Sequence, residues 1–336
     1  MKDWNISEPI LDYTHSNNNA GGKYDGKLVL RPSSLESYIR CPYSFYKQQI
    51  LGEYGPPSGA SQVGTALHAV MEDAILHQLE TGEKMELDEM QRRGVKHWRE
   101  LNDKADIIMH GEQTYQTMAD DLYAGVIALS EALDCMEATA AEGRYSAKIE
   151  GHPMFSAISG SLDVETGVDV VDLKFTGKKK SKPDDYILQQ STYVWLKRIN
   201  GIPAEKFTIL NIVRPTKAKK LKDEQKGIET VADWHFLEGK PNVDYVQHWV
   251  NIILNKTDKF AKYRDSCGDL VASGDMTAEE AKQAVEDFAA LEFQGTSPSN
   301  SFLCNNTWCS HWKTCPHVKA IRDADEFNEV DMLGGN

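Results

Sequence analysis

The stretch that decides the fold is ISGSLDVETGVDVVDLKFTGKKKSKPDDYILQQSTY, which covers residues 158–193. Residues 165–167 have turn chemistry and lie between runs rich in β-branched residues, so we expect a β-hairpin. Side chains two apart on a strand share a face, so Asp172 and Lys174 point the same way. Asp163 lies on the partner strand and reaches the same side within about one residue of register. The hairpin is therefore expected to bring two carboxylates and an amine together.

Taken alone, the hairpin has a simpler explanation, because G-x-x-D and D-x-K are short patterns. That explanation is an exposed edge carrying an Asp–Lys ion pair. The segment that follows favours a functional site instead. Residues 183–185 predict a helix start, and apolar residues recur at helical spacing through 187–199. Gln189 and Tyr193 lie one turn apart on this helix, so a polar pair follows the charged hairpin.

The order G-x-x-D, D-x-K and Q-x-x-x-Y resembles the PD-(D/E)XK nuclease superfamily, and within it the RecB-like branch that includes AddB. The resemblance implies an α/β fold with a restriction-endonuclease-like core, in which helices flank a mixed central sheet, and here with a large helical insertion. It also implies a metal-dependent nuclease in which a lysine orients the attacking water and neutralises the scissile phosphate. The catalytic residues that it implies are Asp163, Asp172, Lys174, Gln189 and Tyr193.

A separate segment agrees with this resemblance. Residues 64–72 read G-x-x-x-H-x-x-x-E on an expected helix. A lone helical histidine is more often structural than a ligand, but this pattern resembles the first motif of the same family, whose histidine joins the metal site. Oxygen donors suit Mg²⁺ or Mn²⁺, and imidazole is a reasonable further ligand. The metal ligands implied are His68, Asp163, Asp172 and the backbone carbonyl of Leu173.

Four of the six cysteines form a further set, one near the N-terminus beside Pro42 and three within twelve residues near the C-terminus. Thiolates in fours bind zinc or an iron–sulfur cluster. The resemblance to iron–sulfur members of the RecB-like branch implies a [4Fe–4S] cluster held by Cys41, Cys304, Cys309 and Cys315. The C-terminal spacing, C-x4-C-x5-C, departs from the commoner family form, C-x2-C-x5-C. Zinc, with His311 or His317 in place of a cysteine, and unligated core cysteines therefore stay open.

The charge distribution suggests where a nucleic acid would bind. The net charge of −14 argues against a protein that coats nucleic acid indiscriminately. Residues 171–222, however, contain thirteen Lys or Arg against four Asp or Glu, and this local surplus attracts phosphate. A solvated lysine-rich loop is the alternative explanation. The possible nucleic-acid contacts are Lys178, Lys179, Lys180 and Lys182.

Several protein classes are disfavoured by what the sequence lacks. No apolar run is long enough to cross a bilayer and the N-terminus has no apolar signal core, so we expect a cytoplasmic protein without a membrane partner. There is no G-x-x-x-x-G-K-[ST] phosphate loop, so we expect no ATP-driven motor. Any unwinding of DNA would then depend on a partner protein. The partner expected is a helicase, or else a recombinase or annealing protein.

These observations lead to one main hypothesis, a DNA exonuclease that acts in recombination, repair or phage replication. The alternative is a non-hydrolytic DNA-binding or assembly subunit that retains the nuclease fold. The expected organisation is a flexible segment at 1–28, N-terminal helices of the nuclease domain at 29–82, a helical insertion at 83–142, the nuclease core at 143–216, a C-terminal helical region at 217–299, a cysteine-rich metal-cluster segment at 300–318 and a tail at 319–336.

Overall fold

The computed structural model of the chain describes residues 2–10, 23–296, 304 and 309–319. Parts of the expected N-terminal segment, C-terminal helical region, cysteine-rich segment and tail lie outside the described residues, namely 1, 11–22, 297–303, 305–308 and 320–336. The chain divides into two compact units. Unit 1 consists of residues 1–55, 146–159 and 247–336, and unit 2 of residues 56–145 and 160–246.

Unit 2 contains a mixed sheet. Its strands are the first part of β3 (Ala140–Lys148), the second part of β4 (Phe155–Thr166), β5 (Asp169–Thr176), β6 (Lys206–Val213) and β7 (Asp233–Gly239). β3 pairs with β4, β4 pairs antiparallel with β5, β5 parallel with β6, and β6 antiparallel with β7. The parallel β5–β6 pair requires a crossover, and the segment that contains α6 (Ile187–Ile199) makes it.

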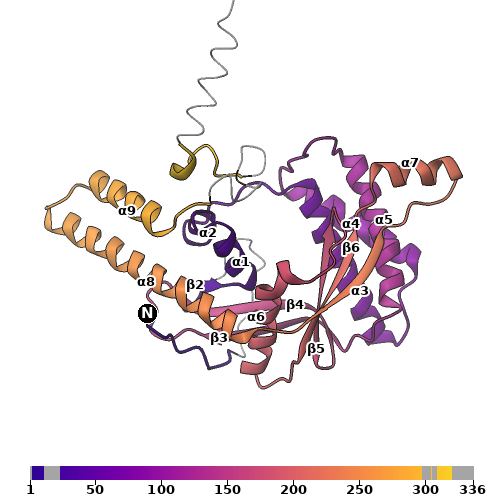
Figure 1. The fold of residues 1–336 in the computed structure, drawn as a ribbon, viewed down its shortest axis with the longest axis horizontal. Coiled ribbons are helices and arrows are strands. Elements are labelled where there is room, and N and C mark those ends of the chain that lie inside the picture. The colour runs from indigo at the N-terminus through magenta and orange to yellow at the C-terminus, as the bar shows by residue number, and fades with distance from the viewer. Residues whose placement is uncertain (1, 11–22, 297–303, 305–308, 320–336) are drawn as a thin grey trace, which may run out of the picture. The chain divides into compact units, whose positions relative to one another are not determined.

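Helices cover both faces of this sheet. Val171 and Leu173 of β5 pack in one cluster with α3 (Gly59–Thr81), α4 (Leu87–Lys104) and α5 (Tyr115–Leu133). Val170, which points the other way on the same strand, packs in a different cluster with α6. Figure 1 shows α3, α4 and α5 gathered on their side of the strands. A mixed sheet flanked by helices confirms the predicted α/β class with a restriction-endonuclease-like core.

The long helices of unit 2 begin and end where local chemistry allows. The Ser58 side chain accepts a hydrogen bond from the backbone N–H of Ser61 and starts α3, which ends at Gly82 in the left-handed region (φ 76°). Thr114 and Thr117 make the same kind of capping box for α5. A shorter helix, α7 (Lys217–Lys226), and a 3₁₀ turn at Asp184–Tyr186 complete the helices described in this unit.

The predicted hairpin is present, but its turn lies two residues further along the chain than expected. β4 continues to Thr166 and β5 begins at Asp169, with Gly167 between them in the left-handed region (φ 63°). Glu165, predicted in the turn, instead pairs with Val170 across the strands. The reason is tertiary, because the Glu165 carboxylate is buried against the Lys197 ammonium and this contact keeps the residue in the strand.

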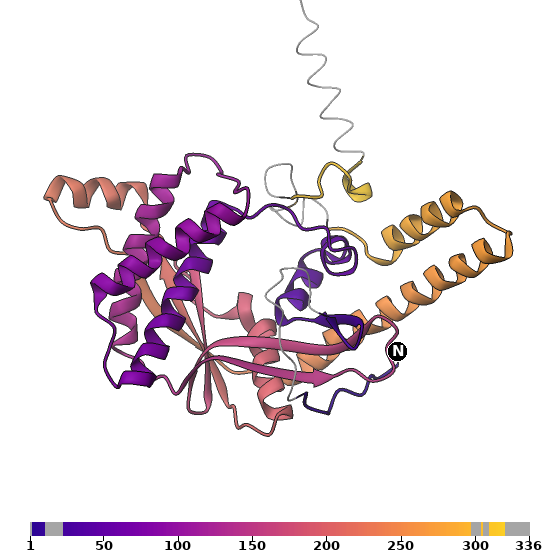
Figure 2. The same ribbon diagram turned by 180° about the vertical axis from the view of Figure 1, so that it is seen from behind.

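Unit 1 combines a small piece of sheet with aromatic-rich helices. Its elements are β1 (Lys23–Tyr24), β2 (Lys27–Leu30), α1 (Pro32–Arg40), α2 (Pro42–Phe45), a π-helix (Tyr46–Ile50), most of α8 (Val243–Ser273), α9 (Ala278–Glu292) and a 3₁₀ turn (Pro316–Val318). β2 pairs in parallel with the start of β4. α8 and α9 lie side by side in both views (Figures 1 and 2), joined by the stacked rings of Tyr263 and Phe288, whose centroids are 4.1 Å apart.

Within the described ranges, none of the helices combines the length and the apolar character needed to cross a membrane.

Candidate active site

Unit 2 brings four of the predicted site residues into direct contact through the hairpin and α3. Nδ1 of His68, on α3, lies 3.0 Å from Oδ2 of Asp163 on β4. The same oxygen accepts a hydrogen bond of 2.8 Å from the backbone N–H of Leu173. Nζ of Lys174 lies 2.7 Å from Oδ2 of Asp172, two residues before it on β5. The hydrogen bond from the Leu173 N–H places the Asp163 carboxylate against β5, as the predicted hairpin requires.

The electrostatics of this group separate the two carboxyls. Burial raises the pKa of Asp163, but the charge and hydrogen bond of His68 and the charge of Lys174 outweigh it, so this pKa lies below its ordinary value. Burial lowers the pKa of His68, and its attraction to Asp163 outweighs that effect and raises it. Burial raises the pKa of Asp172, with repulsion from Asp163 adding to it and attraction to Lys174 opposing it. Asp172 therefore depends on a positive neighbour to stay ionised.

The predicted pair on α6 is buried. Nε2 of Gln189 donates to the hydroxyl of Tyr193 over 3.2 Å, and both side chains are less than a tenth exposed. Tyr186, at the start of the same helix, is a residue that our sequence reasoning missed. Its ring centroid lies 5.6 Å from Nζ of Lys174. The signal for it was present, since it precedes Gln189 by three residues on one helical face.

The predicted metal ligands fit a hard divalent cation by chemical type. Two carboxylates and an imidazole suit Mg²⁺ or Mn²⁺. Oδ2 of Asp172 is buried, and Nζ of Lys174 lies 2.7 Å from it. Nevertheless, no group of three or more His, Cys, Asp or Glu side chains in the described ranges is arranged to hold a metal ion. Asp163 and Asp172 would hold the cation, and because His68 and Lys174 contact these carboxylates directly, those two contacts would have to open.

The predicted nucleic-acid contacts lie in the loop that follows β5. Lys178, Lys179 and Lys182 are exposed, whereas Lys180 is half-buried and pairs with Asp185. The loop leaves β5 after Thr176, two residues beyond Lys174, so it begins close in sequence to the charged group.

The four cysteines predicted to bind a cluster all belong to unit 1. Burial, followed by the charges of the other three thiols, raises the pKa of Cys304 to about 11. The four sulfurs thus lie within electrostatic range of one another. Nε2 of His311 and Nε2 of His317 are buried without a hydrogen-bond partner among the described residues. The described part of this segment contains no assembled metal-holding group, so the structure does not support a [4Fe–4S] cluster.

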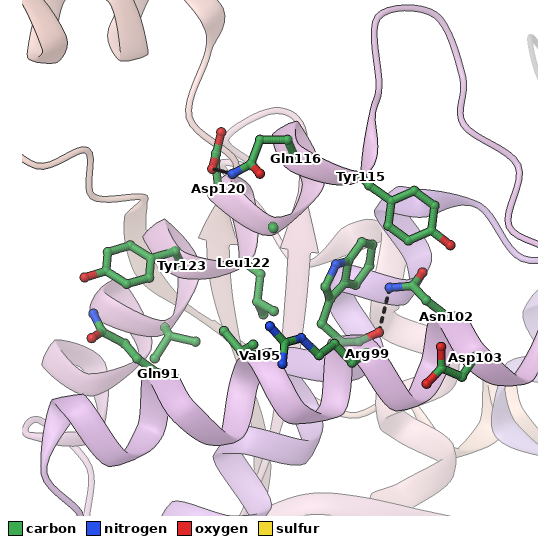
Figure 3. Close-up of a pocket in the computed structure, with 13 residues that line it drawn as sticks. Gln91, Val95, Arg99, Asn102, Asp103, Tyr115, Gln116, Asp120, Leu122 and Tyr123 are labelled. Atoms are coloured by element: carbon green, nitrogen blue, oxygen red, sulfur yellow. Dashed lines mark hydrogen bonds between the residues drawn. The ribbon is translucent and has the colours of Figure 1, made fainter.

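A cavity of about 490 Å³ lies elsewhere in unit 2, between α4 and α5 (Figure 3). Tyr115 and Leu122 contribute to its apolar wall, and Arg99 reaches between Asp103 at one end and Asp120 at the other. None of the predicted catalytic residues lines it. Since the lining of this cavity has one basic side chain, Arg99, against two acidic ones, its field does not favour a phosphate backbone, and the group around Asp163 and Asp172 remains the stronger candidate.

Comparison with known proteins bears on this group of residues. A family model described as the PD-(D/E)XK nuclease superfamily matches residues 30–316 of the chain. The solved structure titled "Crystal structure of SSO0001" aligns with 63% of this chain and 84% of its own, at 13% sequence identity and a TM-score of 0.26. The comparison with curated proteins gave no match. The matched family range includes every predicted site residue, from Cys41 to Cys315.

Proposed function

The chain belongs to the PD-(D/E)XK nuclease superfamily, and on that premise we propose that it is a DNA exonuclease of the RecB-like branch. Membership of this family makes it a metal-dependent nuclease. The finer proposal is that it removes nucleotides from DNA ends during recombination, repair or phage replication. A helicase, or a recombinase or annealing protein, is the kind of partner we propose for supplying those ends.

One observation carries the proposal. Two carboxylates on neighbouring strands each contact a basic side chain, the half-buried Asp163 with His68 at 3.0 Å and the buried Asp172 with Lys174 at 2.7 Å. A surface ion pair would explain one such contact, but Asp172 is only 4% exposed. Placing a buried carboxylate on the strand next to a second, half-buried one is unfavourable for folding alone, and groups with opposed pKa shifts are typical of catalytic sites.

Each residue of the group then has a role in hydrolysis. Asp163 and Asp172 would hold Mg²⁺ or Mn²⁺, with the Leu173 carbonyl and His68 as further ligands. The bound cation would supply a nucleophile at neutral pH and relieve the charge on the leaving oxygen. Lys174 would turn its ammonium from Asp172 to the scissile phosphate and hold it in line with the attacking water.

The pair on α6 would keep the lysine in place from the helix side. The 3.2 Å hydrogen bond between Gln189 and Tyr193 fixes both side chains on one face of the helix. Lys178, Lys179 and Lys182, exposed in the neighbouring loop, would contact the DNA backbone, with the half-buried Lys180 beside them.

The alternative, a non-hydrolytic DNA-binding or assembly subunit, predicts a different outcome in one experiment. End-labelled linear DNA and closed circular DNA are incubated with the protein and Mg²⁺ or Mn²⁺. Loss of the linear substrate alone means an exonuclease, and loss of both means an endonuclease. Binding without loss of either means the alternative. Omitting the metal and adding a chelator is the control, and it should stop all cleavage.

We also propose that Cys41, Cys304, Cys309 and Cys315 bind a metal centre, with a [4Fe–4S] cluster preferred over zinc. Support comes from the mutual electrostatic influence of the thiols on Cys304. Burial raises the pKa of Cys309, while hydrogen bonds from the backbone N–H groups of His311 and Trp312 to its sulfur oppose that rise, since such bonds favour a thiolate. Measurement of iron, sulfide and zinc in the purified protein decides between the two metals. A protein that contains neither would refute the proposal.

A further inference from the structure

The loop at residues 177–182, here called the basic loop, joins β5 to the start of α6 and contains four lysines. It has no regular secondary structure. A lysine-rich loop of this kind is normally mobile, because its charges repel each other and water satisfies its backbone. In this chain, several of its backbone groups are instead tied to the sheet.

The first tie is Asn211, a fully buried residue in the middle of the apolar strand β6. Its Nδ2 donates to the backbone oxygen of Lys174 over 3.2 Å and to the hydroxyl of Thr176 over 2.8 Å. Its Oδ1 accepts from the backbone N–H of Lys180 over 3.3 Å. One side chain thus binds the last residues of β5 and the middle of the basic loop at once.

The second tie is His235, which lies opposite Asn211 on β7. Its Nε2 lies 2.8 Å from the backbone oxygen of Lys180. A carbonyl oxygen can only accept, so Nε2 carries the proton and donates. Lys180 is therefore held through both its N–H and its C=O, by neighbouring residues of two adjacent strands.

The ends of the loop are held as well. The Thr176 hydroxyl donates to the backbone oxygen of Lys178 over 2.9 Å, and the Lys180 ammonium pairs with Asp185 before α6. Lys174, Asn211 and His235 occupy paired positions on β5, β6 and β7. They form a row across the sheet, and the side chains of Asn211 and His235 in this row hydrogen-bond to the backbone of the basic loop at Lys180.

We propose that Asn211 and His235 are positioning residues that hold the basic loop in one conformation, so that its exposed lysines meet successive phosphates of a DNA strand entering the site. The inference rests on the proposed function for the identity of the ligand. Holding the loop in advance removes the entropy that DNA binding would otherwise have to overcome. Asn211 has a second effect, because it also holds the main chain of Lys174.

The two residues should therefore differ in kinetics. The His235 side chain hydrogen-bonds to the loop and not to the main chain of Lys174, so His235→Leu should raise KM for DNA and leave kcat unchanged. Freeing about one residue of backbone corresponds to roughly tenfold in affinity, and we expect KM to rise about tenfold. The slope of log K against log salt concentration should fall by about 1 for each phosphate contact that is lost. His235→Gln keeps a side-chain N–H donor and should restore most of the wild-type KM.

Asn211→Ala should raise KM by a similar factor and also lower kcat, since the Lys174 carbonyl loses its tie. The matched control is Thr208→Val, which removes a buried polar group from the same strand without touching the loop. A residue with a merely structural role would lower thermal stability and leave the salt slope unchanged. Wild-type KM and salt slope in folded His235→Leu, or a fall in kcat alone, would overturn the proposal.

A second measurement separates this inference from the proposed function. Trypsin cleaves after lysine, so release of the basic loop should speed cleavage after Lys178, Lys179 or Lys180 in Asn211→Ala and His235→Leu, by about tenfold, and not in Thr208→Val. This result does not depend on any nuclease activity. Faster loop cleavage in variants of a protein that degrades no DNA would refute the proposed function, but it would still support the proposal that Asn211 and His235 hold the basic loop. Unchanged loop cleavage in the variants of an active nuclease would refute the holding role of Asn211 and His235 and leave the proposed function intact.

Discussion

Replacing Lys197 with methionine should lower the free energy of unfolding by about 3–4 kcal/mol at pH 7. Lys197, on α6, is fully buried, and its Nζ lies 2.7 Å from Oε2 of Glu165 near the end of β4. The hydroxyl of Tyr145 donates to the other oxygen of the same carboxylate, also over 2.7 Å. Methionine matches the four-atom apolar stem of lysine and lacks its ammonium nitrogen. The variant therefore leaves a buried carboxylate with its tyrosine hydrogen bond and without its positive partner.

Two limits set the size of this loss. Removing one partner of a buried ion pair costs about 3–5 kcal/mol. The unpaired carboxyl can also take up a proton, and neutralising an ordinary glutamate, whose pKa in water is about 4.3, costs roughly 4 kcal/mol at pH 7. At pH 5 the same step costs roughly 1 kcal/mol. Protonation therefore limits the loss, and the destabilisation should shrink as the pH falls.

Urea denaturation followed by circular dichroism at pH 7 and pH 5 measures this difference. Adding Glu165→Gln to Lys197→Met removes the buried charge and should recover more than half of the loss at pH 7. The matched control is Lys206→Met, whose ammonium lies 3.3 Å from Asp169 and 3.2 Å from Glu238 but is 41% exposed. Because these ion pairs are exposed to solvent, that change should cost far less stability than Lys197→Met. A loss for Lys197→Met no larger than for the control, or one that grows as the pH falls, would refute the reasoning.

Three further predictions concern single residues. Asp172→Asn and Lys174→Ala should each slow DNA cleavage at least about a hundredfold while fluorescence anisotropy shows DNA binding retained, and near-normal cleavage by either would remove that residue from the catalytic group. Tyr186→Leu should lower kcat by about twofold to thirtyfold, whereas Tyr186→Phe, which keeps the ring 5.6 Å from the Lys174 ammonium, should not, and equal rates for the two would argue against the cation–π contact. Burial lowers the pKa of His152 to about 4, so the protein should lose up to about 3 kcal/mol of stability as the pH falls from 6.5 to about 4, and acid titration of His152→Gln should lack this loss.

The sequence predicts those contacts of the charged group that depend on local strand and hairpin geometry. Alternation along a strand put Asp172 and Lys174 on one face, and the structure gives them a 2.7 Å contact. The hairpin brought Asp163, on β4, beside β5, where the Leu173 N–H donates a hydrogen bond to it. His68 was different, because only the family resemblance singled it out from an ordinary helical histidine. Its contact with Asp163 depends on how α3 packs on the sheet, which no local pattern specifies.

Two other residues show what sequence patterns can say about the remaining contacts. Asn211 and Lys197 are polar residues inside apolar runs, FTILNIV and YVWLKRI, and both are completely buried. Burying an amide or an ammonium without a partner costs several kcal/mol, so each pattern requires that a partner exist. It does not say which one, because the partners come from other elements. For Lys197 the partner is Glu165, whose sequence suggested a turn, and the strand extends to Thr166 because that pair forms. A polar residue inside an apolar run, close in sequence to a catalytic motif, is therefore a good candidate for a positioning residue, even though its partner cannot be named from the pattern.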